Sequence, residues 1–210
     1  VVPIPYFAEW TQRTSSFDGT SIYAVTYGNG MFVAVGYGGK LATSPDGITW
    51  TRRTSSFGTD SIRGVTYGNG MFVAVGAAGK LATSPDGITW TQRTSSFGLI
   101  DIWDVTYGNG MFVAVGDNGK LATSPDGITW TQRTSSFDGT SIYGVTYGNG
   151  MFVAVGAEGK LTTSPDGITW TWRLSGFRPD AIYGVTYGNG MFVAVGYNGN
   201  LATSPDGITW

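Results

Sequence analysis

The side chains of this chain that could bind or transform another molecule occur where five near-identical segments differ. The chain has 210 residues with no histidine and no cysteine. Thiol nucleophiles, histidine acid–base catalysis and zinc sites of the Cys/His type are therefore excluded. One group of candidates lies near the starts of predicted strands and consists of Tyr23, Arg63, Trp103, Asp104, Tyr143 and Tyr183. A second group lies in predicted turns and consists of Tyr37, Asp117, Asn118, Glu158, Tyr197 and Asn198. Tyr, Trp and Arg are enriched at binding hot spots, so these residue types favour recognition of a partner.

These candidates lie at the variable positions of a sequence repeat of 40 residues. The repeats are 11–50, 51–90, 91–130, 131–170 and 171–210, and a short segment, 1–10, precedes them. Of the 40 positions, 27 are identical in all five copies and 13 vary, so most of each repeat is fixed. A period of this length predicts one supersecondary unit per repeat, and the sequence is interpreted as a single domain over 1–210.

Each repeat contains four strand-like runs separated by turn residues. In the first repeat these runs are 21–27, 31–35, 40–44 and 48–54, and they are rich in Val, Ile, Thr, Tyr, Phe and Trp. The turns Gly-Asn-Gly and Ser-Pro-Asp-Gly supply the backbone angles of tight hairpins. Four strands joined in order predict a meander, and five meanders in tandem predict the blades of a β-propeller. A solenoid is the competing repeat architecture.

The run Ser-Pro-Asp-Gly-Ile-Thr-Trp ends every repeat and resembles the Asp-box hairpin of sialidase-type β-propellers. It has one residue fewer between Asp and Gly than the usual box. The resemblance implies a propeller fold and a structural role for its aspartates, which are Asp46, Asp86, Asp126, Asp166 and Asp206.

The predicted fold class is all-β, a five-bladed β-propeller of four-stranded antiparallel meanders closed by an N-terminal outer strand. The segment 9–14 matches the outer-strand sequence of 49–54, while the last repeat ends at Trp210 before its own outer strand. Residues 10–14 are therefore predicted to complete the fifth blade, because open sheet edges invite aggregation. A monomer is expected, with a swapped dimer as the alternative.

The variable positions predict one uniform and one individual face of the disc. The two hairpin turns at one end of each meander never change, whereas the turns and links at the other end differ between repeats. The individual face is interpreted as a recognition surface. Free drift of surface loops is the competing explanation.

The leading functional interpretation is a non-catalytic binding or scaffold propeller that recognises a protein on the individual face. A glycan-binding lectin is the first alternative, and an engineered or recently amplified repeat protein without a specific ligand is the second. An enzyme is not expected, because the arginine cluster of a sialidase-type site is missing around Arg63 and Asp104.

Composition narrows the partners further. The net charge is −2 and charged residues make up 12% of the chain, so nucleic acid is not an expected partner. No apolar run reaches the length of a membrane span, and the opening residues do not resemble a signal peptide. No metal site and no cofactor are predicted. A bacterial extracellular and a cytoplasmic location both stay open.

Overall fold

The computed structural model, which describes residues 10–210, contains five antiparallel sheets, and the fourth strand of each four-stranded sheet comes from the start of the following 40-residue repeat. The first four sheets have four strands each and the fifth has three, and strands adjacent in sequence are adjacent in the sheet. The first sheet consists of β1 (Ile22–Gly28), β2 (Met31–Gly36), β3 (Leu41–Ser44) and β4 (Thr51–Arg53). The second sheet consists of β5 (Ile62–Gly68), β6 (Met71–Gly76), β7 (Leu81–Ser84) and β8 (Thr91–Arg93).

The other three sheets repeat the same lengths and order. The third sheet consists of β9 (Ile102–Gly108), β10 (Met111–Gly116), β11 (Leu121–Ser124) and β12 (Thr131–Arg133). The fourth sheet consists of β13 (Ile142–Gly148), β14 (Met151–Gly156), β15 (Leu161–Ser164) and β16 (Thr171–Arg173). The fifth sheet consists of β17 (Ile182–Gly188), β18 (Met191–Gly196) and β19 (Leu201–Ser204). Short 3₁₀ turns join the second and third strands: η1 (Tyr37–Gly39), η2 (Ala77–Gly79), η3 (Asp117–Gly119), η4 (Ala157–Gly159) and η5 (Tyr197–Gly199).

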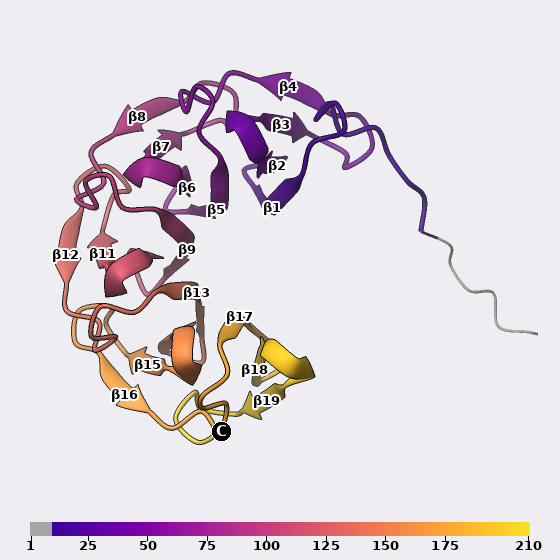
Figure 1. Ribbon diagram of the computed structural model, residues 1–210. Helices are drawn as coiled ribbons and strands as arrows, with labels where there is room; N and C mark the ends of the chain where they lie inside the picture. Colours follow the sequence, from indigo (N-terminus) through magenta and orange to yellow (C-terminus); the bar gives the residue numbers. More distant parts are fainter. Residues whose placement is uncertain (1–9) are drawn as a thin grey trace, which may run out of the picture.

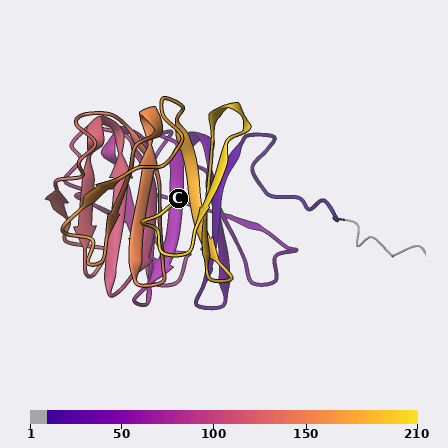
Figure 2. The same ribbon diagram turned by 90° about the horizontal axis from the view of Figure 1, so that it is seen from below.

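The five sheets stand side by side around a common axis, like blades (Figure 1). The first strand of each sheet lies nearest the axis, and the short fourth strands β4, β8, β12 and β16 lie on the outside (Figure 1). Seen from the side, the blades form one layer about one strand length thick (Figure 2). This radial arrangement of five antiparallel meanders confirms the predicted all-β propeller class.

The core lies between neighbouring blades. The cluster between the first two blades joins Val33, Val35 and Leu41 of one sheet to Ile62 and Phe72 of the next. Corresponding clusters fill the next three interfaces. The second strand of the inner blades, with the sequence Met-Phe-Val-Ala-Val-Gly, is buried on both of its faces, as its continuous apolar run predicts, whereas Val195 in the same strand of the fifth blade is 45% exposed.

The predicted closing strand is not formed in this structure. Residues 10–14 adopt no strand, the Trp10 residue is 99% exposed, and the fifth sheet keeps three strands. Glu9 and most of the segment 1–10 lie outside the described residues. Trp210 instead occupies the position of its equivalents, with its Nε1 donating to the Gly207 carbonyl at 2.8 Å.

The physical reason for this difference is the curvature of the array. The innermost strands contact one another in sequence from β1 to β17, through four interfaces built from the same residues. The angle set by these interfaces leaves β1 and β17 apart, so the blades form an open arc rather than a closed ring (Figure 1). Residues 10–14, attached to the first blade, are not paired with β19.

Candidate functional site

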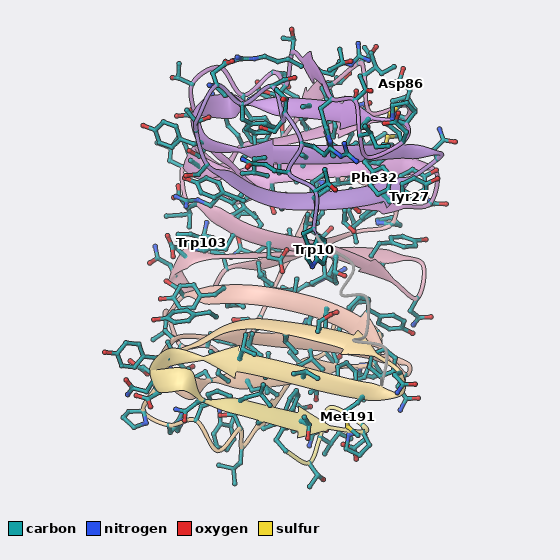
Figure 3. All side chains as sticks on the ribbon, turned by 90° about the vertical axis from the view of Figure 1, so that its right-hand side faces the viewer. Trp10, Tyr27, Phe32, Asp86, Trp103 and Met191 are labelled. Atoms are coloured by element: carbon teal, nitrogen blue, oxygen red, sulfur yellow. The ribbon has the colours of Figure 1, made fainter. Side chains whose placement is uncertain are left out.

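The residues that vary between repeats and the invariant hairpin turns lie at opposite ends of the blades. Trp103 lies at one rim of the molecule, whereas Asp86 and Met191 lie at the opposite rim (Figure 3). Strand direction explains this separation, because the turns η1 to η5 and the links between blades share one end of the meanders. We call this end the variable face and the other end the hairpin face.

A row of packed side chains crosses the variable face from the second blade to the fifth. Arg63 Cζ lies 3.9 Å from the centre of the Trp103 ring, a cation–π contact. The Trp103 and Tyr143 rings meet edge to face with their centroids 5.9 Å apart, and Tyr143 lies 6.0 Å from Tyr183. Arg63, Trp103 and Tyr143 are partly buried, and Tyr183 is 55% exposed. We call these four residues the aromatic row.

Two aspartates fix the aromatic row in place. Arg63 Nη2 donates to Asp101 Oδ2 at 2.6 Å, and the backbone N–H of Ala78 donates to Asp101 Oδ1 at 2.8 Å. Trp103 Nε1 donates to Asp117 Oδ1 at 2.7 Å. The charge of the guanidinium is therefore compensated within the protein, and the row presents mainly aromatic surface.

Asp101 is a residue that the sequence interpretation missed. The available signal was its column in the repeat, where the other copies have Ser21, Ser61, Ser141 and Ala181. A single carboxylate among small residues marked a specific contact, but its partner on another blade was not evident from spacing alone.

The predicted site residue Asp104 is directed into the structure rather than toward the row. Its Oδ1 accepts the Val105 N–H at 2.8 Å, and its Oδ2 accepts the Val145 N–H of the next blade at 2.9 Å. Desolvation raises the pKa of the Asp104 carboxyl to about 6, against the lowering effect of the two N–H donors. Asp104 therefore links the inner strands β9 and β13.

The remaining predicted residues lie on the same face but are not part of the row. Tyr23, Tyr37 and Tyr197 are about half exposed. Glu158 Oε2 lies 3.3 Å from Lys160 Nζ, in an ion pair whose carboxylate is exposed and whose ammonium group is largely buried. The other two are Asn118, which is exposed, and Asn198, whose Nδ2 donates to Asp180 Oδ2 at 3.4 Å.

The five aspartates of the hairpin face hold their own turns together. In the first repeat the N–H groups of Thr49 and Ile48 donate to Asp46 Oδ1 at 2.9 and 2.8 Å, and Ser44 Oγ donates to it at 2.9 Å. These donors, Thr49 first, hold the pKa of that carboxyl below its ordinary value, and the other four repeats show the same lowering. Trp50 Nε1 closes the turn by donating to the Gly47 carbonyl at 3.2 Å. The arrangement supports a structural role for these residues.

Shallow grooves recur where the end of an outer strand meets the link that follows it. One groove of about 290 Å³ is lined by Gly38, Gly39, residues 52–56 and Gly58. Its counterpart one repeat later measures about 580 Å³ and includes Lys80 and Gln92. A third, of about 560 Å³, lies along residues 12–19. Their linings are rich in Ser, Thr, Gly and basic side chains.

Within residues 10–210, no cluster of three or more Asp or Glu side chains has the spacing of metal ligands. The same part of the chain contains no helix of the length and hydropathy that crossing a bilayer requires.

Radially arranged antiparallel meanders with a variable face define a β-propeller. The sequence model of one family, the DUF6242 beta propeller domain, matches residues 63–173. The chain belongs to this family. The match supports a propeller with repeated blades, and the Asp-box resemblance stays a prediction. A comparison with curated protein sequences gives no match.

Solved structures of several propellers are similar in fold. A catalytically inactive virginiamycin B lyase from Staphylococcus aureus, bound to quinupristin, gives a TM-score of 0.79 at 13% identity, over 96% of this chain and 75% of that one. YCF48 from Cyanidioschyzon merolae gives 0.69 at 18% identity, over 92% and 72%. YCF48 bound to D1 peptide gives 0.68 at 19% identity, over 88% and 63%. The computationally designed protein Ika8 gives 0.69 at 11% identity, over 87% of this chain and 57% of that one. The chain thus spans between just over half and three quarters of the length of these structures.

Proposed function

We propose that this chain is a non-catalytic binding propeller whose variable face recognises a segment of a partner protein. The observation that carries the proposal is the aromatic row, in which Arg63, Trp103, Tyr143 and Tyr183 from four blades form one connected surface. Large aromatic side chains that are already held in place lose little conformational freedom on binding, which favours affinity.

The dimensions of the row suit a short peptide. Its successive contacts of 3.9, 5.9 and 6.0 Å give a length of at most about 16 Å, which an extended peptide covers in four or five residues. The compensated charge of Arg63 and the aromatic surface favour a segment with apolar or aromatic side chains. One structurally similar propeller, YCF48, was solved bound to a peptide, which is consistent with this use of the fold.

The side chains of the variable face also argue against catalysis. Its arginine is paired with Asp101, and its most perturbed carboxyl, Asp104, is held by two backbone N–H groups between blades.

A peptide-display selection on the immobilised protein tests the proposal. Selected peptides should bind the unmodified chain and lose about 30-fold or more in affinity to a variant with Arg63→Ser, Trp103→Ser and Tyr183→Ser, as expected for hot-spot residues. The matched control is Ile88→Ser, an exposed substitution on the hairpin face that should leave binding unchanged. Circular dichroism would show that each variant keeps its strands. Peptides that bind the triple variant equally well, or no selected peptides at all, would contradict the proposal.

Glycan binding is the second candidate, and the recurring grooves favour it. A multivalent lectin gains avidity from the same pocket in several blades. The grooves beside residues 52–58 and 92–99 repeat in position and in their polar lining. A glycan array would distinguish the two functions, because glycan binding through these grooves should survive the triple substitution in the aromatic row.

A further inference from the structure

The two ends of the arc expose surfaces that are buried everywhere else in the array. At the first blade, Val25 is 60% exposed, whereas its equivalents Val65, Val105 and Val145 are at most 8% exposed. At the fifth blade, Leu201 is 62% exposed, whereas its four equivalents, such as Leu121, are fully buried. Each end therefore presents one half of the interface that joins neighbouring blades.

The contacts that define an internal interface each lack one partner at these ends. In every internal interface, a tyrosine ring of one blade covers the glycine that ends the inner strand of the blade before it. The four pairs are Gly28 with Tyr67, Gly68 with Tyr107, Gly108 with Tyr147, and Gly148 with Tyr187. No atom of the described residues lies within 4 Å of a Cβ placed on Gly188, and Tyr27 is 57% exposed. Gly188 therefore lacks the tyrosine ring that covers its equivalents. Tyr27, at the other end of the arc, is an exposed tyrosine of the kind that makes this contact.

Hydrogen bonds repeat the same pattern. An asparagine of each hairpin turn donates through Nδ2 to a proline carbonyl of the next blade at 3.1–3.3 Å. The four pairs are Asn29 with Pro85, Asn69 with Pro125, Asn109 with Pro165, and Asn149 with Pro205. Asn189 at one end and the Pro45 carbonyl at the other are the members of this series that have no such bond among residues 10–210. The two ends are therefore complementary in shape and in hydrogen bonding.

The N-terminal segment supplies a matching outer strand. Thr11, Gln12 and Arg13 have the sequence of β8 and β12, which pair with the third strands of their blades. In the third blade Leu121 pairs with Arg133, and Arg133 Nε donates to Thr123 Oγ1 at 3.0 Å. A blade packed against β1 could pair its own third strand with residues 11–13, which adopt no strand in this structure.

The geometry points to one occupant for this gap: one or two further blades of the same 40-residue repeat. Such a blade would pack on β1, and Tyr27 would cover the glycine that ends the inner strand of that blade. Residues 11–13 would form its outer strand. The number of missing blades can be estimated from one similar propeller. The alignment with it covers 96% of this five-blade chain but only 75% of the other chain, so the other chain is longer by one or two blades. A ring with that curvature has about six or seven blades, within the four to eight typical of propellers.

The test uses cysteine reactivity, because the chain has no cysteine of its own. Val25→Cys places a single thiol on the exposed face of β1, and Val105→Cys places one at the equivalent buried position. Leu99→Cys, in a link that is 87% exposed, reports full reactivity. Each variant is made in the 210-residue chain and in chains lengthened after Trp210 by one, two or three copies of repeat 131–170.

In the 210-residue chain we expect the Val25→Cys thiol to react nearly as fast as that of Leu99→Cys. Lengthening by one or two repeats should slow its labelling by about 100-fold or more, toward the rate of Val105→Cys, as burial at a packed interface requires. Labelling that is already slow and independent of concentration in the 210-residue chain would mean that its own fifth blade covers β1. Labelling that slows as protein concentration rises would mean that a second copy covers it. Either result, or rapid labelling at every length, would overturn the proposal.

A second variant keeps the test independent of thiol chemistry. Gly188→Leu adds a large side chain at the end of the inner strand of the fifth blade, where a Cβ contacts no described atom. In the 210-residue chain it should leave the melting temperature nearly unchanged. In the lengthened chains Gly188 becomes an internal position, so the same substitution should lower the melting temperature sharply. An equal change in melting temperature in the 210-residue and the lengthened chains would contradict the proposal that a further blade covers Gly188.

Discussion

Leucines with the same sequence environment but different burial allow a direct test of the open arc. Leu121 is fully buried between the third and fourth blades, and Leu201 occupies the same repeat position but is 62% exposed. Replacing Leu121 by Ala should lower the free energy of unfolding by about 2–5 kcal/mol, the range for fully buried leucines. Burying a whole leucine contributes about 1.5–3 kcal/mol, so the buried minority of Leu201 contributes about 1 kcal/mol or less. Leu201→Ala should therefore cost a small fraction of the loss at Leu121.

The assay is chemical denaturation followed by tryptophan fluorescence, at the lowest concentration that gives a signal. Both variants keep the local sequence Gly-x-Ala-Ala-Thr-Ser, so propensity effects cancel and the difference reports burial. Equal losses for the two variants at low concentration would refute the reasoning. That result would mean that the isolated chain covers Leu201 and that its ends meet.

Three further predictions concern equivalent positions in different repeats or the dependence of stability on pH. Gly148→Ala places a Cβ against the Tyr187 ring and should lower the melting temperature by several degrees, whereas Gly188→Ala should be close to neutral; similar shifts would contradict the interface described here. The pKa of Asp104 is raised to about 6 in the folded state, so the wild type should lose up to about 3 kcal/mol of stability as pH rises from about 4 to above 6. Asp104→Asn should lack this loss, which denaturation at several pH values would measure. The pKa of Asp126 is lowered, chiefly by the Thr129 N–H, so its stabilising effect exists above the unfolded value near 4 and is lost as pH falls through the folded value. Asp126→Ala should therefore be less stable than the wild type at neutral pH, and the difference should shrink in acid.

Local features of the fold were predictable because their causes are local. The Gly-Asn-Gly turns are hairpins in which Asn29 adopts a positive φ of 48°, an angle that Asn tolerates. The apolar run of β2 is buried on both faces, with Val33 at 0% exposure on one face and Ala34 at 4% on the other, as its composition indicates. The fourth strand is shorter than predicted, since β4 (Thr51–Arg53) begins after Trp50. The Trp side chain belongs instead to the hairpin, through its bond to a glycine carbonyl.

Features that depend on several blades at once could not be predicted from the sequence. The failure of residues 10–14 to reach β19 follows from the angle between blades, which many side chains set together. The partners of Asp101 and Asp104 lie on neighbouring blades, so residue type identified the position but not the contact. The four residues of the aromatic row were predicted as binding candidates, and their packing against one another came only from the distances.

The close similarity of the four interfaces has a consequence for how the chain folds. Any blade presents a surface that fits any other, so packing alone does not distinguish the neighbouring repeat from a distant one. Only the short link between successive blades favours the correct pair, because a nearby partner is met sooner than a remote one. Refolding from denaturant is therefore prone to misordered blades, and the few residues that differ between repeats have to prevent them.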